Sequence, residues 1–194
     1  PLLKERYIDS YLSELNGITN LTVYDPTDDL MNVKNSEGYL YYKTDTHWNE
    51  KGSFISFNNL LSKLGYMGPK VEFSKRDTIA GDLIRISKIK DYKLKNVDSW
   101  LANIDHPYHL TRTVNQEVAI NEAFGNQEIV FNSNPVIEKQ IWVVGDSFTD
   151  ALKPYLNATF REVHYVGHLR DKLNILSSDL RKSQTKPDII LIIK

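Results

Sequence analysis

The fold can be predicted outward from Ile141-Trp-Val-Val-Gly-Asp-Ser-Phe148. Its first four residues are all apolar, which is typical of a strand covered on both faces in a parallel sheet. Gly145 supplies a turn, and the composition of Ser147–Asn157 favours a helix with Pro154 near its last turn. The segment therefore predicts a strand that leads directly into a helix.

The same order continues toward the end of the chain. Glu162–Val166 alternates like a strand, Arg170–Lys182 has leucines at helical spacing, and Ile189–Ile193 is an apolar strand that we expect to be buried. Strand, helix, strand, helix and strand with short connections predict an α/β fold. Its sheet should be parallel, with right-handed crossovers and helices on both faces.

The first half of the chain is predicted to be mainly helical, and the middle to be built from short strands. The expected early elements are helices at Leu2–Leu15, from Asp28, and at Asn49–Leu64, and a strand at Leu21–Tyr24. The expected hairpins or short strands of the middle lie around Leu83–Ile89, Thr111–Ile120 and Glu128–Phe131. We interpret residues 1–194 as a single domain, with 67–140 as an insertion or a substrate-side region.

Composition excludes several classes of protein. The chain has 194 residues, 24 Lys and Arg against 25 Asp and Glu, and no Cys. A chain of this length buries about 70% of its unfolded surface, which is enough for a core without disulfides. The lack of Cys excludes zinc–thiolate sites, iron–sulfur clusters and a cysteine nucleophile, and the balanced charge argues against nucleic acid as a partner. Because the chain begins at Pro1 without Met, we expect it to be a fragment of a longer protein.

Ser147 is a candidate nucleophile because of its place in the predicted fold. Ligands bind at the carboxyl ends of strands in an open α/β sheet, and a helix N-terminus offers unpaired N–H groups to a developing anion. A serine at this junction is exposed and lies beside an oxyanion donor. The alternative is a helix N-cap, a position that both Asp and Ser favour.

A serine nucleophile needs a base, and Thr44-Asp-Thr-His-Trp48 contains one. Asp45 and His47 are two residues apart, so in an extended segment both side chains point to the same side. The carboxylate can accept one ring N–H of the imidazole and leave the other nitrogen for Ser147. The alternative is a surface His beside a helix-capping Asp.

Together these motifs resemble those of a known family. Tyr42-Lys-Thr-Asp-Thr-His-Trp-Asn49 with Gly52, followed about a hundred residues later by Gly145-Asp-Ser-Phe148, resembles the SGNH-hydrolase-like domains of alginate O-acetyltransferases and DHHW proteins. Ala80-Gly-Asp-Leu83 and Ala151–Leu156 also match, so the resemblance extends from about Tyr24 to Lys194. It implies a flavodoxin-like, three-layer α/β fold with a central, mostly parallel sheet. It also implies the permuted motif order of this branch, with Asp-x-His before GDSF, whereas in the wider GDSL esterases the pair follows the Ser.

The resemblance implies a role for each candidate residue. Ser147 would be the nucleophile, His47 the general base and acid, and Asp45 the residue that orients the imidazole. The Ser147 N–H and Gly81 are candidate oxyanion donors, each worth about 3 kcal/mol if it meets the oxyanion. Arg170 is a candidate for substrate binding, with an ordinary surface arginine as the alternative.

The aromatic and histidine clusters allow further interpretations. Tyr42 and Trp48 belong to an aromatic cluster that either fills the core or stacks on sugar rings near His47. His106 and His109 have no further ligands at usable spacing, so we expect no metal site. The implied acyl-transfer chemistry requires no cofactor.

The function implied by the resemblance is transfer of an acetyl group to a bacterial cell-surface polysaccharide through an acetyl-serine intermediate. The implied partners are the polysaccharide acceptor and an acetyl donor, the latter supplied by a membrane-bound O-acyltransferase. The implied location is outside the cytoplasm, with a membrane anchor in the full-length protein as one option. Two alternatives stay open: a carbohydrate acetylesterase with water as the acceptor, and a non-catalytic glycan-binding protein with a degenerate site.

Overall fold

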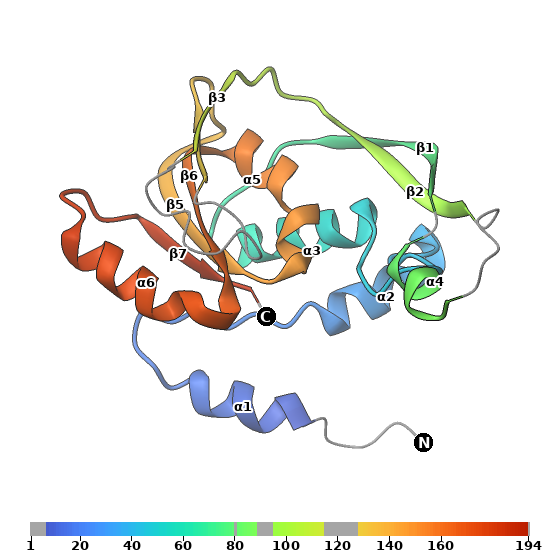
Figure 1. The fold of residues 1–194 in the computed structure, drawn as a ribbon, viewed down its shortest axis with the longest axis horizontal. Helices are drawn as coiled ribbons and strands as arrows, with labels where there is room; N and C mark the ends of the chain where they lie inside the picture. The colour runs from blue at the N-terminus through green and yellow to red at the C-terminus, as the bar shows by residue number, and fades with distance from the viewer. Residues whose placement is uncertain (1–6, 80, 89–94, 115–127, 194) are drawn as a thin grey trace.

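The computed structural model describes residues 7–79, 81–88, 95–114 and 128–193, and its centre is a five-stranded sheet with the order β3-β4-β6-β5-β7 (Figure 1). The strands are β3 (Leu110–Val114), β4 (Glu128–Asn132), β5 (Ile137–Gly145), β6 (Phe160–His168) and β7 (Ile189–Ile192). β5 runs parallel to β6 and β7, while β4 runs antiparallel to β6 and β3. The predicted α/β fold is confirmed. Its parallel part is formed by the strands of the final third, and the antiparallel pair widens the sheet at the β6 edge.

The strand β5, the middle one of the three parallel strands, is buried on both faces, as its continuous apolar run predicts. Ile141 and Val143 share one core with side chains of the helices α3 (Glu50–Lys63) and α5 (Lys153–Thr159). Trp142 and Val144 face the opposite side, where they share a second cluster with Leu176 of α6 (Leu169–Lys182). Helices therefore cover both faces of the sheet.

The strand β7 was predicted to be buried, and this prediction is wrong. Ile190 and Ile192 are 43% and 53% exposed. β7 is the edge strand of the sheet, and its alternate residues Ile189 and Leu191 pack against the core. Successive side chains of a strand point to opposite faces, so the other two are left uncovered.

The predicted helices of the first half are confirmed within the described ranges. They are α1 (Tyr7–Leu15), α2 (Thr27–Glu37) and α3. Residues 2–6 of the first predicted helix lie outside the described residues, as do residues 115–120 of the strand predicted at Thr111–Ile120, whose first part is β3. None of the helices in the described ranges is long and apolar enough to cross a membrane.

Three local predictions are wrong. Leu21–Tyr24 connects α1 to α2 without forming a strand. Leu83 lies in a short helix, α4 (Asp82–Ile86), and not in a strand. The helix expected at Ser147–Asn157 is divided into a 3₁₀ helix, η2 (Ser147–Ala151), and α5, and Pro154 lies in the first turn of α5. A proline there sacrifices no intrahelical hydrogen bond, because the first N–H groups of a helix have no partner within it.

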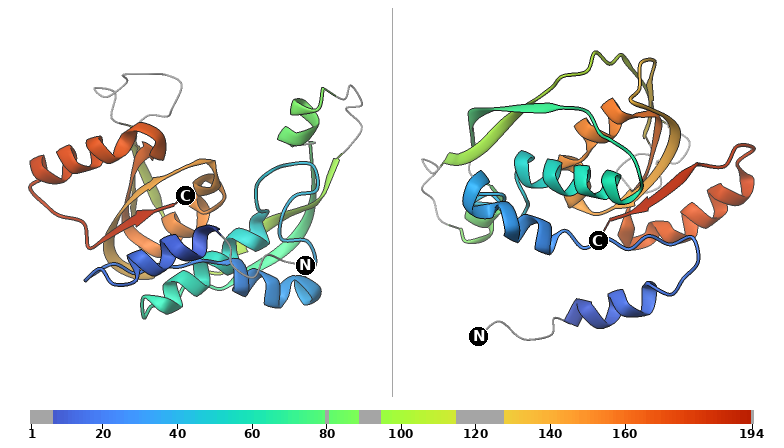
Figure 2. Two further views of the ribbon diagram at one scale, coloured as in Figure 1. Left: turned by 90° about the horizontal axis from the view of Figure 1, so that it is seen from below. Right: turned by 180° about the vertical axis from the view of Figure 1, so that it is seen from behind.

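A two-stranded antiparallel ribbon, β1 (Val71–Ile79) and β2 (Lys95–Ile104), is separate from the main sheet and lies beside α3 (Figure 2). Phe73 of the ribbon contacts Phe54 of α3 edge-on, with ring centroids 5.6 Å apart. Arg76 and Trp100 of the ribbon both bond to Glu50, the first residue of α3. Part of the region 67–140 is thereby placed next to the segment that contains Asp45 and His47.

Asn49 joins the ribbon, α3 and the loop that precedes α3. Its side chain is fully buried, and its amide nitrogen donates to the carbonyl oxygens of Tyr39 (2.7 Å) and Asp98 (3.0 Å). Its Oδ1 accepts the N–H of Gly52 at 3.0 Å and caps the helix. A buried amide whose donors and acceptor are all engaged holds its partners in one arrangement.

Gly52→Ala is expected to destabilise the fold, because a Cβ at this position would lie 2.2 Å from the carbonyl oxygen of Leu40. The loop would have to shift, so the free energy of unfolding should fall by about 1–3 kcal/mol in a denaturant titration. Gly17→Ala is the matched control, since nothing lies within 4 Å of a Cβ there. Equal losses in the two variants would contradict the close packing of α3 on this loop.

Candidate active site

Ser147 lies at the carboxyl end of β5, as predicted, and is the first residue of η2. The helix cap is Asp146, whose carboxylate accepts the N–H of Phe148 at 2.9 Å. The N-cap interpretation of Ser147 is therefore wrong, and its exposed hydroxyl is free to reach another group. That group is His47, whose Nε2 lies 2.7 Å from Ser147 Oγ across 100 residues of sequence.

Asp45 and His47 meet in a turn and not in the extended segment that we predicted. The turn is closed by the N–H of Tyr42, which donates to the His47 carbonyl oxygen at 3.2 Å, and by a single bridge between Tyr41 and Trp48. Asp45 Oδ1 accepts the His47 backbone N–H at 3.0 Å, which is the geometry of an Asx turn. The same oxygen is hydrogen-bonded to His47 Nδ1.

These contacts assign the two nitrogens of the imidazole. Asp45 is an acceptor, so Nδ1 carries the proton and Nε2 is left to accept the hydroxyl of Ser147. Asp45 Oδ2 in turn accepts the backbone N–H of Asp82 at 2.9 Å. Partial burial of Asp45 acts to raise its pKa, but the hydrogen bonds from Asp82 and from His47 outweigh it and lower the pKa below the ordinary value. Asp45 is therefore held as a carboxylate.

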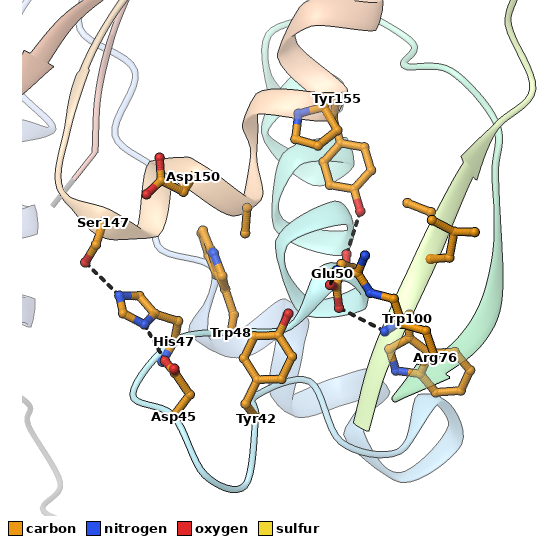
Figure 3. A pocket seen from close by; sticks show the side chains of 14 residues that line it. Tyr42, Asp45, His47, Trp48, Glu50, Arg76, Trp100, Ser147, Asp150 and Tyr155 are labelled. Carbon is orange, nitrogen blue, oxygen red and sulfur yellow. Dashed lines mark hydrogen bonds and ion pairs between the residues drawn. The ribbon is translucent and has the colours of Figure 1, made fainter. Parts of the chain in front are cut away.

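Residues 81–83 form a clamp over the turn that contains Asp45 and His47. The Asp82 carboxylate accepts the N–H of Thr46 at 2.9 Å and its hydroxyl at 2.7 Å. The N–H of Leu83 donates to the carbonyl oxygen of Thr44 at 3.1 Å. Backbone and side-chain bonds from this one segment thus hold the turn (Figure 3 shows the turn with Asp45 and His47).

Gly81 belongs to this clamp and does not fit the expected role of oxyanion donor. Its N–H already donates to Thr44 Oγ1 at 3.0 Å. A Cβ at Gly81 would lie 2.3 Å from Asp45 Oδ2, so the residue lies against Asp45, and any side chain would displace that carboxylate. The other candidate donor fits better, because the Ser147 N–H has no acceptor within the described part of the chain.

A pocket of about 420 Å³ opens beside Ser147 and His47 (Figure 3). Its lining includes Tyr42, Glu50, Arg76 and Trp100 as well as the three predicted residues. Tyr42 is a half-buried wall of this pocket. Trp48 also borders it but is 7% exposed and donates its ring N–H to the Phe148 carbonyl oxygen at 3.1 Å, so most of its surface belongs to the core.

Sequence reasoning missed several residues of the site. Asp82 lies in one of the segments on which the predicted resemblance rests, but only Gly81 was considered there. No sequence motif marks Glu50 and Arg76 as site residues, because their contact depends on how the ribbon crosses α3. Arg170 is in the first turn of α6, and its side chain lies outside the described residues.

Asp45, His47 and Asp82 are also the group in the described chain that comes nearest to a metal-ligand set, with ligand atoms within 4.8 Å of one another. Their oxygens already accept hydrogen bonds from Thr46, His47 and the Asp82 N–H. A cation would have to displace these bonds and take His47 away from Asp45. The arrangement fits an oriented imidazole better than a metal centre.

The sequence matches no protein-family model and no curated protein. Among solved structures, a DHHW family protein from Eubacterium siraeum has a TM-score of 0.65 at 14% identity, over 95% of this chain and 68% of that chain. PatB1 from Bacillus cereus has a TM-score of 0.60 at 15% identity, over 100% and 75%. The chain has the fold of these two proteins. The O-acetyltransferase domain of AlgJ from Pseudomonas putida gives a TM-score of 0.47 at 14% identity, over 98% and 66%. The predicted resemblance to the DHHW proteins is confirmed at the level of the fold.

Asp82→Ala is expected to release the turn, because it removes both acceptors of Thr46. The Thr46 amide should then exchange with solvent at least about tenfold faster, as measured by hydrogen exchange in NMR spectra. The amide of Lys43 is the internal control, since it donates to Asp98 at 2.8 Å and keeps that partner. Unchanged exchange at Thr46, or equal acceleration at both amides, would contradict the clamp.

The lowered pKa of Asp45 predicts a pH-dependent contribution to stability. A carboxyl group whose pKa is lower in the folded state stabilises the fold above its unfolded pKa, and the contribution is lost as pH falls through the folded pKa. The difference in unfolding free energy between the wild type and Asp45→Asn should therefore be largest near neutral pH and shrink in acid. A difference that grows in acid would contradict the assigned hydrogen bonds.

Proposed function

We propose that this protein is an O-acetyltransferase that modifies a bacterial cell-surface polysaccharide through a Ser147–His47–Asp45 triad. The observation that supports the proposal is the hydrogen-bonded chain from Asp45 through His47 to Ser147 Oγ at the mouth of an open pocket. Asp-x-His precedes the serine in the chain, which supports the permuted motif order that the resemblance implies. Together these residues supply a nucleophile, a base and a group that orients the base.

In the first half of the proposed reaction, Ser147 Oγ attacks the carbonyl carbon of an acetyl donor while His47 Nε2 takes the hydroxyl proton. Asp45 stabilises the imidazolium that forms. The Ser147 N–H donates to the developing oxyanion. Because this donor is already in place, it stabilises the negative charge of the transition state. Collapse of the intermediate breaks the bond to the donor's leaving group. That group departs with the proton from His47 and leaves an acetyl-serine.

In the second half, a sugar hydroxyl gives its proton to His47 Nε2 and attacks the acetyl carbonyl. The ester bond to Ser147 breaks, its oxygen recovers a proton from His47, and the acetylated sugar leaves. The partners of this scheme are a polysaccharide acceptor and an acetyl donor that a membrane-bound O-acyltransferase supplies. Both substrates imply that the protein works outside the cytoplasm.

A carbohydrate acetylesterase is the second candidate, and one observation favours it. Ser147 is exposed and the pocket beside it is open to solvent, so water has access to an acetyl-serine. The two enzymes share the triad and differ in how well the acceptor site excludes water. A non-catalytic glycan-binding role gains no support, because His47 is hydrogen-bonded both to Asp45 and to Ser147, as a working triad requires.

Ser147→Ala is expected to lower turnover of an acetyl-ester reporter by a factor on the order of 10⁶, or to the background rate, because no other group replaces the nucleophile. A sulfonyl fluoride should label the wild type at Ser147, as shown by peptide mass spectrometry. Ser36→Ala is the matched control, since this exposed serine donates to the Val33 carbonyl oxygen of its own helix and does not line the pocket. Full activity in Ser147→Ala would contradict the triad and favour a non-catalytic role for the site.

The choice between transferase and esterase is made by adding acceptors to the reporter assay. With a transferase, oligosaccharide should accelerate consumption of the reporter and appear as an acetylated sugar in the mass spectrum. Release of acetate with no acetylated sugar, for every acceptor tried, would contradict the transferase and establish the esterase.

A further inference from the structure

Glu50, Arg76 and Trp100 lie at the end of the pocket away from Ser147, and Tyr42 lies between them and His47 (Figure 3). These four side chains are here called the distal cluster. They come from the turn with Asp45 and His47, from the start of α3, and from both strands of the ribbon. The proposed acetyl transfer uses none of them. Because Ser147 and the distal cluster line one continuous pocket, a molecule bound at the cluster can present an atom to Ser147.

Glu50 is the centre of the distal cluster. Its Oε1 accepts from Arg76 Nη2 at 2.7 Å, and its Oε2 accepts the backbone N–H of Trp100 at 3.0 Å. The Glu50 side chain is 15% exposed, whereas that of Arg76 is 49% exposed. A guanidinium has five N–H donors and a carboxylate oxygen has two lone pairs, so this fixed pair offers both donors and acceptors to a ligand.

Tyr42 adds a hydroxyl group between this pair and the triad. Its own N–H is bonded to the His47 carbonyl oxygen, so the ring is positioned by the same turn as the imidazole. Burial, followed by the charge of Glu50, raises the pKa of Tyr42, which keeps the phenol protonated as both donor and acceptor. The indole of Trp100 closes the end of the pocket, with the Lys51 ammonium 4.3 Å from its ring centroid.

The charged side chains of the pocket lining leave it with a net negative charge. Glu50 pairs with Arg76 and Asp150 with Lys153 at 2.9 Å, whereas Asp45 is hydrogen-bonded to the neutral imidazole of His47 and keeps its charge. A lining of this kind does not attract an anion. Adjacent polar donors and acceptors beside aromatic walls suit a ligand that is uncharged, rich in hydroxyl groups and apolar on its ring faces.

We propose that Tyr42, Glu50 and Arg76 form the acceptor subsite of the pocket, and that it binds a neutral pyranose unit through neighbouring hydroxyl groups. The inference rests on the proposed function. The bound sugar directs a further hydroxyl toward the acetyl group on Ser147. Holding the acceptor in this way raises the rate of transfer relative to attack by water, because the sugar is positioned and water is displaced.

The test measures binding without catalysis, in a Ser147→Ala background. Cellopentaose and chitopentaose are titrated into the protein by calorimetry, with pentagalacturonate as the charged counterpart. Arg76→Gln and Tyr42→Phe should each weaken binding of a neutral pentasaccharide at least about tenfold. The first removes a charge-assisted hydrogen bond to the sugar, and the second removes a neutral one. Arg112→Gln is the matched control, because it removes the same charge from an exposed arginine that is ion-paired with Glu128 at 3.5 Å and does not line the pocket. It should leave the affinity unchanged.

In the active protein, Arg76→Gln should raise the acceptor KM by a similar factor and lower kcat far less. Tighter binding of pentagalacturonate, equal affinity in Arg76→Gln and its control, or no binding of either neutral sugar would overturn the subsite. Failure of the proposed function would give a different result. The wild type would then neither turn over the reporter nor be labelled at Ser147, whether or not it binds the pentasaccharides. Circular dichroism establishes that each variant is folded.

Discussion

The site depends on one turn being held in place, because His47 must meet a serine that lies 100 residues later in the chain. The turn is anchored at three points. The N–H of Lys43 donates to Asp98 at its start, the Asp82 carboxylate holds Thr46 in its middle, and the buried amide of Asn49 fixes its end. Asp98 and Asp82 come from segments distant in sequence, and Asn49 is itself bonded to the carbonyl oxygen of Asp98. The imidazole is therefore positioned by the tertiary fold and not by the local conformation of an Asp-x-His tripeptide.

The ribbon has a double role in this arrangement. Its strand β2 provides Asp98, which accepts from Lys43 through its side chain and from Asn49 through its carbonyl oxygen. The same strand and its partner provide Trp100 and Arg76, which close the distal end of the pocket. One element thus supports the proposed catalytic turn and shapes the space in front of it. We expect a change in the ribbon to alter both the position of His47 and the shape of the proposed acceptor subsite.

The parts of the fold that could be predicted are those with a strong local signal. Ile141–Val144 has apolar residues on both faces and lies between two parallel neighbours. Ile189–Ile193 is equally apolar but lies at an edge of the sheet, which no local pattern reveals. The motifs around His47 and Ser147 were brought together as predicted. Gly81 was expected to donate to an oxyanion, but its N–H donates to Thr44 Oγ1. No local pattern in the sequence reveals that contact. Glu50 and Arg76 were missed, since their contact is made between elements.

The most direct measurement of the central claim is the mass of the Ser147 peptide after the protein is mixed with an acetyl ester and quenched in acid. The triad predicts one added acetyl group on Ser147, formed rapidly in the wild type and at least about a hundredfold more slowly in His47→Ala, since the general base is lost. Acetylation that is confined to surface lysines, or that reaches Ser147 equally fast in both proteins, would contradict it.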